Sequence, residues 1–174
     1  MEFASYRPEW LDMLIEQDEK LRMDKFTADD ALRLGLIMAR LARDEYCQPI
    51  SIRIIIGGHT AFSHLMDGTD SFNDWWMDKK LNTCRASGVS SIRTLVEIGE
   101  GKRAMEPEFE NENDYALCGG CWPVRDHQGK LLGYVESSGM SHERDHQLLI
   151  DAMAELYSTD FAFTALPKHP ALER

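Results

Sequence analysis

Segments of helical and of strand-like periodicity follow one another along the chain, and their order predicts the fold. The first helical segment covers residues 9–22, where four side chains recur at helical spacing: Trp10, Leu14, Gln17 and Leu21. The second covers residues 28–45, because Thr27 and Asp30 have the spacing of a capping box and a broad apolar face follows them. We therefore expect two helices before the first strand.

A β-hairpin is predicted next. Isoleucines occupy every second position of residues 50–56, and this period-two pattern of β-branched residues is typical of a strand. Gly57 and Gly58 suit a two-residue turn of the primed type. We expect residues 59–66 to return as the antiparallel partner.

The second half of the chain predicts two further helices, three strands and a last helix. The first helix is capped by Ser71 or Asn73 and stops near Gly88, and a shorter one covers residues 90–98. Residues 99–114 are mostly charged and lack periodicity. The remaining predicted elements are strands at residues 115–118, 121–125 and 131–137 and an amphipathic helix that begins at Ser141.

This order of elements predicts an α+β fold with a five-stranded antiparallel sheet flanked by helices. We expect residues 1–19 to form an N-terminal helical extension, residues 20–158 a single α+β domain, and residues 159–174 a C-terminal tail. A chain of 174 residues buries about 70% of its unfolded surface on folding. Its core therefore needs neither disulfides nor a structural metal.

Charge excludes two classes of partner. The net charge of −11 opposes binding to phosphate backbones and to anionic lipid surfaces, so we expect no nucleic-acid and no membrane partner. Residues 12–30 and 97–114 carry −4 and −5 of this charge, which leaves the rest of the chain nearly balanced. The N-terminus has no export signal, so we expect a cytoplasmic protein whose four cysteines are free thiols.

Residues 142–146 read His-Glu-Arg-Asp-His, the H-E-x-x-H pattern of zinc peptidases. The pattern stands at the start of the predicted last helix, where we expect His142 to face solvent, and no Gly-x-x-His extension follows it. The sequence therefore favours an ordinary helix start, with Glu143 and Asp145 near the positive end of the helix dipole.

Residues 118–121 read Cys-Gly-Gly-Cys, and three interpretations of this pair stay open. It can supply half of a zinc site, act as a dithiol redox couple, or consist of two structural thiols beside a glycine turn. The adjacent glycines themselves indicate positive φ angles or the close approach of another group.

A set of spaced motifs resembles one known family. In chain order these motifs are Gly68-Thr69, Asn73-Asp74, Trp76 and Lys80, Ser90-Ser91, Tyr115-Ala116, Gly119-Gly120, Pro123, Gly133, Ser138-Gly139 and Asp145-His146. Together they resemble the UPF0303-type branch of the GlcG/HbpS-like "haem-degrading domain" proteins over about residues 20–157. This resemblance implies a profilin-like or PAS-like fold, assembly into homo-oligomers and the binding of a small planar or compact ligand, with haem as the candidate cofactor.

The resemblance also implies a ligand pocket bordered by Gly119-Gly120 and by the start of the last helix. Cys118 or His146 is the expected iron ligand if haem binds; the family usually has His where Cys118 stands, and thiolate and imidazole both bind iron. Asp145 is expected to orient a histidine, while three residues of one helix line or support the pocket: Asn73, Trp76 and Lys80.

Two other interpretations use the same residues. In the first, the protein is a non-enzymatic oligomeric scaffold or adaptor, and the motif residues form its subunit interfaces. In the second, Cys118 and Cys121 carry thiol redox chemistry or bind zinc.

Overall fold

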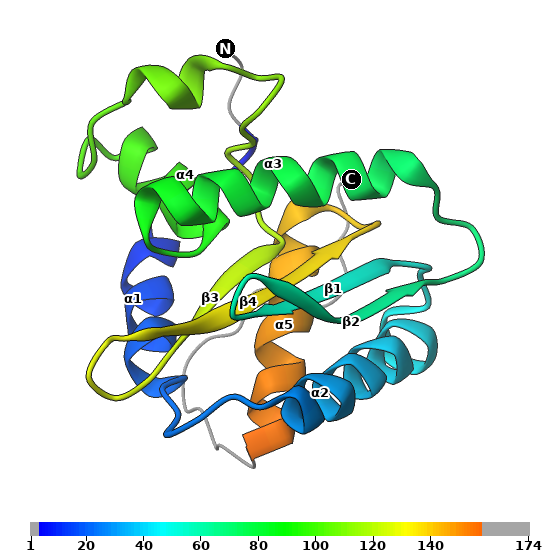
Figure 1. Cartoon of the computed structure of the whole chain (residues 1–174). Helices are drawn as coiled ribbons and strands as arrows, with labels where there is room; N and C mark the ends of the chain where they lie inside the picture. The colour runs from blue at the N-terminus through cyan, green and yellow to red at the C-terminus, as the bar shows by residue number, and fades with distance from the viewer. Residues whose placement is uncertain (1–3, 158–174) are drawn as a thin grey trace.

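A four-stranded antiparallel sheet lies at the centre of the computed structural model, which describes residues 4–157 (Figure 1). The strands are β1 (Ser51–Ile56), β2 (His59–Leu65), β3 (Cys121–Arg125) and β4 (Leu131–Ser138), in the order β2-β1-β4-β3. The helices are α1 (Trp10–Lys20), α2 (Ala28–Leu41), α3 (Ser71–Ser87), α4 (Ser91–Gly99) and α5 (His142–Tyr157), with short η1 (Ala42–Tyr46) and η2 (Pro107–Glu110). The α+β class is therefore confirmed, and the predicted tail at residues 159–174 lies outside the described residues.

Helices α2 and α5 cover one face of the sheet, and α3 crosses the other (Figure 1). The alternation of side chains along β1 decides which residue meets which layer. Ile52 and Ile54 lie in the larger core with α2 and α5, whereas Ile55 packs against Leu81 of α3. The fully buried Trp122 of β3 belongs to the larger core.

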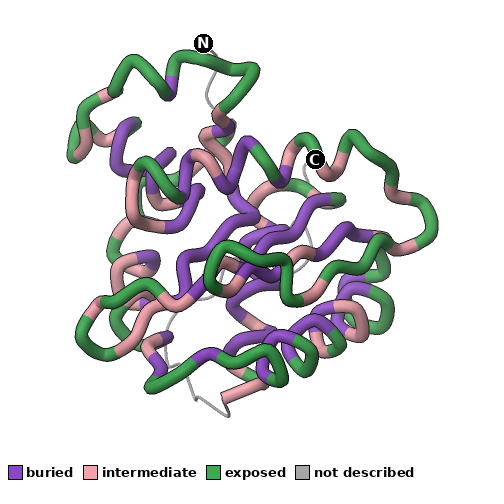
Figure 2. Tube along the Cα trace, in the orientation of Figure 1, coloured by how far each residue is buried: buried purple, intermediate pink, exposed green. Residues whose placement is uncertain are grey.

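The predicted hairpin is present. Strands β1 and β2 pair antiparallel, and the turn residues Gly57 and Gly58 have φ angles of 58° and 80°, which glycine adopts without steric cost. Figure 2 shows that β1 and β4 are largely buried, whereas β2 at the sheet edge is mostly exposed.

Helix α2 begins as predicted and ends earlier. The Thr27 hydroxyl accepts from the Asp30 backbone N–H at 3.2 Å, and the Asp30 carboxylate accepts from the Thr27 N–H at 2.9 Å, so the capping box is confirmed. The helix then continues as the wider π-helical turn η1, which ends at Tyr46. The next residue, Cys47, has a φ of 52°, in the left-handed region of backbone conformation. This turn buries Tyr46, whose hydroxyl donates to Asp151 at 2.8 Å.

Helix α3 is capped by a residue that the prediction missed. Asp70 is the cap, and its carboxylate accepts from the Phe72 backbone N–H at 2.8 Å. Asn73 closes a capping box through its side-chain oxygen, which accepts from the Asp70 N–H at 3.1 Å. The helix ends at Gly88 as predicted, where φ is 75°.

The fifth predicted strand, at residues 115–118, is wrong: the sheet has four strands. A side chain of α3 takes the place of a strand partner there. The Ala116 N–H donates to the Thr83 hydroxyl oxygen at 3.1 Å, and that hydroxyl donates to the Ala116 carbonyl oxygen at 2.9 Å. Because Thr83 satisfies these buried backbone groups, the segment is held against α3 without joining the sheet.

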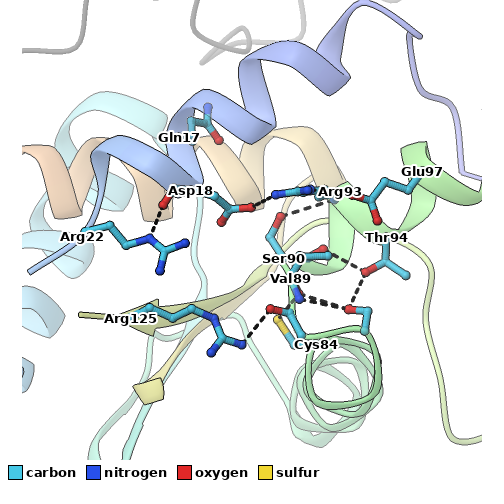
Figure 3. A network of polar contacts seen from close by, with 12 residues as sticks. Gln17, Asp18, Arg22, Cys84, Val89, Ser90, Arg93, Thr94, Glu97 and Arg125 are labelled. Atoms are coloured by element: carbon cyan, nitrogen blue, oxygen red, sulfur yellow. Dashed lines mark hydrogen bonds and ion pairs between the residues drawn. The ribbon is translucent and has the colours of Figure 1, made fainter. Parts of the chain in front are cut away.

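Ionic contacts and apolar packing attach α1 to α4. Leu14 is fully buried against Ile92 and Val96 of α4. Arg93 donates to Asp18 at 2.5 Å and to Glu97 at 2.7 Å (Figure 3). The first helix is thereby fixed close to α5, where its Gln17 reaches the buried part of the molecule. Within residues 4–157, no helix is long and apolar enough to cross a membrane.

We expect Thr83→Val to destabilise the protein, because this nearly isosteric change leaves the Ala116 N–H and carbonyl without their partner. The loss of unfolding free energy should be about 1–3 kcal/mol, as for other buried polar groups left unsatisfied. Urea denaturation followed by circular dichroism measures it. An unchanged midpoint would show that another group holds the segment at residues 115–118.

Candidate functional site

A pocket of about 360 Å³ lies where the start of α3 meets the start of α5. This volume falls at the lower end of the range of about 300–1,000 Å³ for small-molecule sites. Five of the eight predicted site residues line it: Asn73, Trp76, Lys80, Cys118 and Asp145. The other three, Gly119, Gly120 and His146, are not among the residues that line it.

Helical spacing places the α3 side chains in the pocket. Asn73, Trp76 and Lys80 are separated by three and four residues, so they share one face of the helix. Phe72 lies four residues before Trp76 and also lines the pocket, with its ring perpendicular to that of Trp76 at 6.1 Å. Phe72 is not among the predicted site residues, although the same helical spacing identifies it.

A buried ion pair lies at the base of the pocket. Lys80 Nζ donates to Asp145 Oδ2 at 2.8 Å and to the Ser137 carbonyl oxygen at 3.0 Å. Asp145 Oδ1 accepts from the Met140 N–H at 3.2 Å. The side chains of Lys80 and Asp145 are 4% and 2% exposed. Each charge is therefore compensated by a partner of opposite sign, as buried charges require.

The Gly119-Gly120 pair allows two close approaches, as the sequence indicates. A methyl group at Gly120 would lie 2.5 Å from Lys80 Nζ and 2.5 Å from the Ser137 carbonyl oxygen, and its φ is +123°. A methyl group at Gly119 would collide with the carbonyl oxygen of His142. The glycines thus admit the lysine on one side and the start of α5 on the other.

The expectation that His142 faces solvent is wrong, because its side chain is only 13% exposed. Its Nδ1 accepts from the Gly119 N–H at 3.3 Å, and its Nε2 lies 2.8 Å from the Ser5 carbonyl oxygen. These two contacts correspond to the neutral ring protonated on Nε2. Burial lowers the pKa of His142, in agreement with that form. His142 therefore joins the N-terminal segment, including the pocket-lining Ala4, to the glycine turn.

His146 lies deeper, on the α1 side of α5. It is fully buried, and its Nε2 is 2.8 Å from Gln17 Oε1. Its ring packs near Trp122, with centroids 5.8 Å apart. Burial lowers the pKa of His146 to about 3, so the ring is neutral at physiological pH. The two histidines of the H-E-x-x-H pattern thus contact different parts of the molecule.

The two thiols of the Cys-Gly-Gly-Cys segment lie in different surroundings. Cys118 lines the pocket, whereas Cys121 is buried beneath α3 with Cys84 and Leu81. All four cysteines are free thiols, as expected. Burial raises the pKa of Cys118, although the Lys80 ammonium lowers it. In the part of the chain that is described, no group of three or more His, Cys, Asp and Glu side chains is arranged to hold a metal ion.

Burial is the largest influence on the pKa values of Lys80 and Asp145. It raises the pKa of Asp145 to about 6, although Lys80 and the Met140 N–H lower it. For Lys80, burial lowers the pKa, but the charge and hydrogen bond of Asp145 together with the neighbouring Cys118 and Glu136 outweigh it, and the net change is upward. The lysine is therefore charged throughout the physiological range, and Asp145 becomes neutral in mildly acidic solution.

We expect the wild type to lose stability relative to Asp145→Asn as pH rises from 4 to 7. The raised pKa means that the folded state favours the protonated carboxyl, so the stabilising contribution present at low pH is lost through pH 6. The change should total about 3 kcal/mol, at roughly 1.4 kcal/mol per pKa unit. Urea denaturation of both proteins across this range measures it. The opposite slope would show that Lys80 stabilises the carboxylate more than burial penalises it.

Comparison with known proteins places the chain in a family. The family model described as "Haem degrading protein HbpS-like" matches residues 26–154. A UPF0303 protein of Psychromonas ingrahamii is 32% identical over 82% of this chain and 90% of its own length. A UPF0303 protein of Schizosaccharomyces pombe is 30% identical over 84% and 83%.

Solved structures have the same fold. The crystal structure of Ybr137w protein superimposes with a TM-score of 0.72 at 22% identity, covering 86% of this chain and 89% of the other. The structure of a PduOC:haem complex gives a TM-score of 0.62 at 20% identity, covering 75% and 94%. With the motifs from Gly68-Thr69 to Asp145-His146 in order on this fold, the chain belongs to the HbpS-like haem-degrading protein family.

Proposed function

We propose that this protein binds a compact planar ligand in the pocket between α3 and α5, and that haem is the leading candidate. The observation that carries the proposal is the pocket itself, which combines a thiol, two aromatic rings and a buried ion pair in one cavity. Membership of the HbpS-like family supports haem as the ligand, as does the likeness in fold to PduOC, which was solved with haem.

Of the residues that line the pocket, one is suited to bind haem iron as a ligand. Cys118 lines the pocket, and a cysteine thiolate is an established ligand of haem iron. Both ring nitrogens of His142 already make polar contacts, and His146 is not part of the lining. Of the two iron ligands expected from the sequence, Cys118 is therefore the one that we propose.

The chain's own groups have separable tasks in this proposal. Phe72 and Trp76 supply flat apolar surface for the ligand and exclude water from it. Cys118 would hold the iron as a thiolate, and the neighbouring Lys80 ammonium favours that charged form. Bound haem would supply the iron centre itself.

We expect haem to saturate the protein at one equivalent per chain and to give a shifted Soret band. Cys118→Ala should abolish the thiolate signature of that band and weaken binding at least about tenfold, because loss of even a hydrogen-bond partner of a metal ligand costs about 10- to 100-fold in affinity. Titration with absorbance and resonance Raman detection measures both.

Cys47→Ala is the matched control, because Cys47 is an exposed thiol that is not among the residues lining the pocket. It should bind haem as the wild type does. A featureless, non-saturating titration of the wild type would contradict haem binding, and an unchanged spectrum in Cys118→Ala would exclude Cys118 as the ligand.

An exposed aromatic pair favours a second candidate function, that of an oligomeric scaffold. Phe72 and Trp75 are 60% and 41% exposed, and their rings stack at 5.3 Å. Exposed aromatic residues are enriched in interfaces and rare elsewhere on surfaces. In this candidate, copies of the chain associate through the start of α3, and the motif residues serve that contact.

We expect Trp75→Ser to shift an oligomer toward monomer if the start of α3 is a subunit interface. Leu36→Ser on α2 is the matched control, because Leu36 is 58% exposed and lies on another surface. Sedimentation velocity of both variants and of the wild type measures the change. Equal sedimentation of all three would exclude this interface. Haem titration of the same samples shows whether ligand binding and assembly are separable.

A further inference from the structure

The hydrogen-bonding groups of the pocket are unequally available to a ligand. Asp145 Oδ2 accepts from Lys80, and Oδ1 accepts from the Met140 N–H. The side-chain oxygen of Asn73 accepts from the Asp70 N–H. The side-chain oxygens of Asp145 and Asn73 are therefore already engaged by the protein's own donors.

Donors remain on the same wall. The Lys80 ammonium has three N–H groups. Two of them donate to Asp145 and to the Ser137 carbonyl oxygen, and within residues 4–157 no further acceptor contacts Nζ. The Ser138 hydroxyl accepts a long contact of 3.5 Å from Asn73 Nδ2, which leaves its own proton free to donate. Lys80 and Ser138 both line the pocket and are 3% and 4% exposed.

This donor-rich wall of the pocket, formed by Lys80 and Ser138, favours a ligand group that accepts hydrogen bonds and donates none. A ligand donor placed beside Asp145 or Asn73 would compete with the protein's own donors for the same oxygens, and a donor that loses its hydrogen bond to water without regaining one costs free energy. An oxygen acceptor would gain a charge-assisted hydrogen bond from the ammonium. Phe72 and Trp76 line the same pocket, and their apolar rings suit a flat ring system.

The number of charges favours a carboxylate over a phosphate. One ammonium lies in the pocket, and Asp145 already balances it. A phosphate dianion would bring two negative charges beside that aspartate, in a chain of net charge −11. A carboxylate brings one charge that is spread over two acceptor oxygens.

We propose that the pocket recognises the carboxylate of a flat aromatic ligand, with the Lys80 ammonium and the Ser138 hydroxyl as its donors. The inference rests on the pocket of the proposed function, but it does not require iron. It applies equally to the propionate of a porphyrin and to a small aromatic acid, which share this chemistry. Lys80 thus acts as the polar anchor, and the rings of α3 hold the flat body.

Two matched ligand pairs test the proposal on the full chain. The first pair is metal-free protoporphyrin IX and its dimethyl ester, and the second is 2-naphthoate and 2-naphthamide. In each pair the partners differ in whether the carboxyl group is free or blocked. Binding is measured by quenching of tryptophan fluorescence, because Trp76 lines the pocket, and by isothermal titration calorimetry.

We expect the free acid of a binding pair to bind about 10- to 100-fold more tightly than its blocked partner, the order of one charge-assisted hydrogen bond. The double variant Lys80→Met/Asp145→Asn should remove this preference, so that the free acid and its blocked partner bind with equal affinity. Changing both residues avoids an unpaired buried charge. Lys79→Met is the matched control, because Lys79 is buried one position away but lies over the Trp75 ring at 3.9 Å. It should keep the preference, and thermal unfolding confirms that each variant is folded.

The outcomes separate this inference from the proposed function. Equal affinity for the acid and its blocked partner in both pairs overturns the inference, as does a preference that persists in the double variant. A preference for naphthoate without binding of either porphyrin supports the carboxylate site and shows that the pocket does not recognise a porphyrin in the absence of iron. Absence of binding by all four ligands overturns the inference, whereas the haem titration of the wild type decides the proposed function separately.

Discussion

The ion pair between Lys80 and Asp145 is the contact on which the arrangement of the site depends. It joins the middle of α3 to the first turn of α5, and the second hydrogen bond of Lys80 reaches the end of β4 at Ser137. Helix α3 therefore meets the consecutive elements β4 and α5, which are 57 and 65 residues away at the contacting positions, at one nitrogen atom. Because an unpaired charge is very costly in the protein interior, neither side chain can be lost alone without a large penalty. The pair thus restricts the relative position of the two helices more than apolar packing alone would.

Two glycines near the ion pair are required by close packing. Gly120 is small because the Lys80 ammonium occupies the space that a side chain would fill. Gly139 has a φ of 152° and no room for a methyl group beside the Pro49 carbonyl oxygen, so the chain can turn from β4 toward α5. The Met140 N–H after this turn donates to Asp145. The pocket adjoins these constraints, since Lys80, Asp145, Gly139 and Met140 line it together with Phe72 and Cys118.

Local patterns predicted most of the fold, because the signals that define these elements are local. The capping box of Thr27 and Asp30, the hairpin glycines and the stop at Gly88 all act within a few residues, and each is confirmed. The prediction of a fifth strand is wrong for a non-local reason. Thr83 forms hydrogen bonds with Ala116, thirty-three residues away, and the periodicity of the sequence gives no information about such a contact. The predicted cap of α3 is wrong because Ser71 and Asn73 both lie inside the helix, one and three residues after the cap Asp70.

In the predicted site, too, helical spacing groups the residues that share one helix, whereas it does not place residues that distant segments position. Asn73, Trp76 and Lys80 share a helix face, so their grouping follows from spacing, and Cys118 and Asp145 joined them through the family resemblance. The histidines could not be placed from spacing. His142 and His146 are four residues apart, and that pattern predicts a shared direction.

The partners of the two rings explain their separation. His142 is held by Gly119 and by Ser5 of the N-terminal segment, while His146 is held by Gln17 of α1. The position of α1 is in turn fixed by Arg93 of α4 through Asp18 (Figure 3). A ring in this region is therefore oriented by contacts from three distant segments, which outweigh the direction that helical spacing alone would give it.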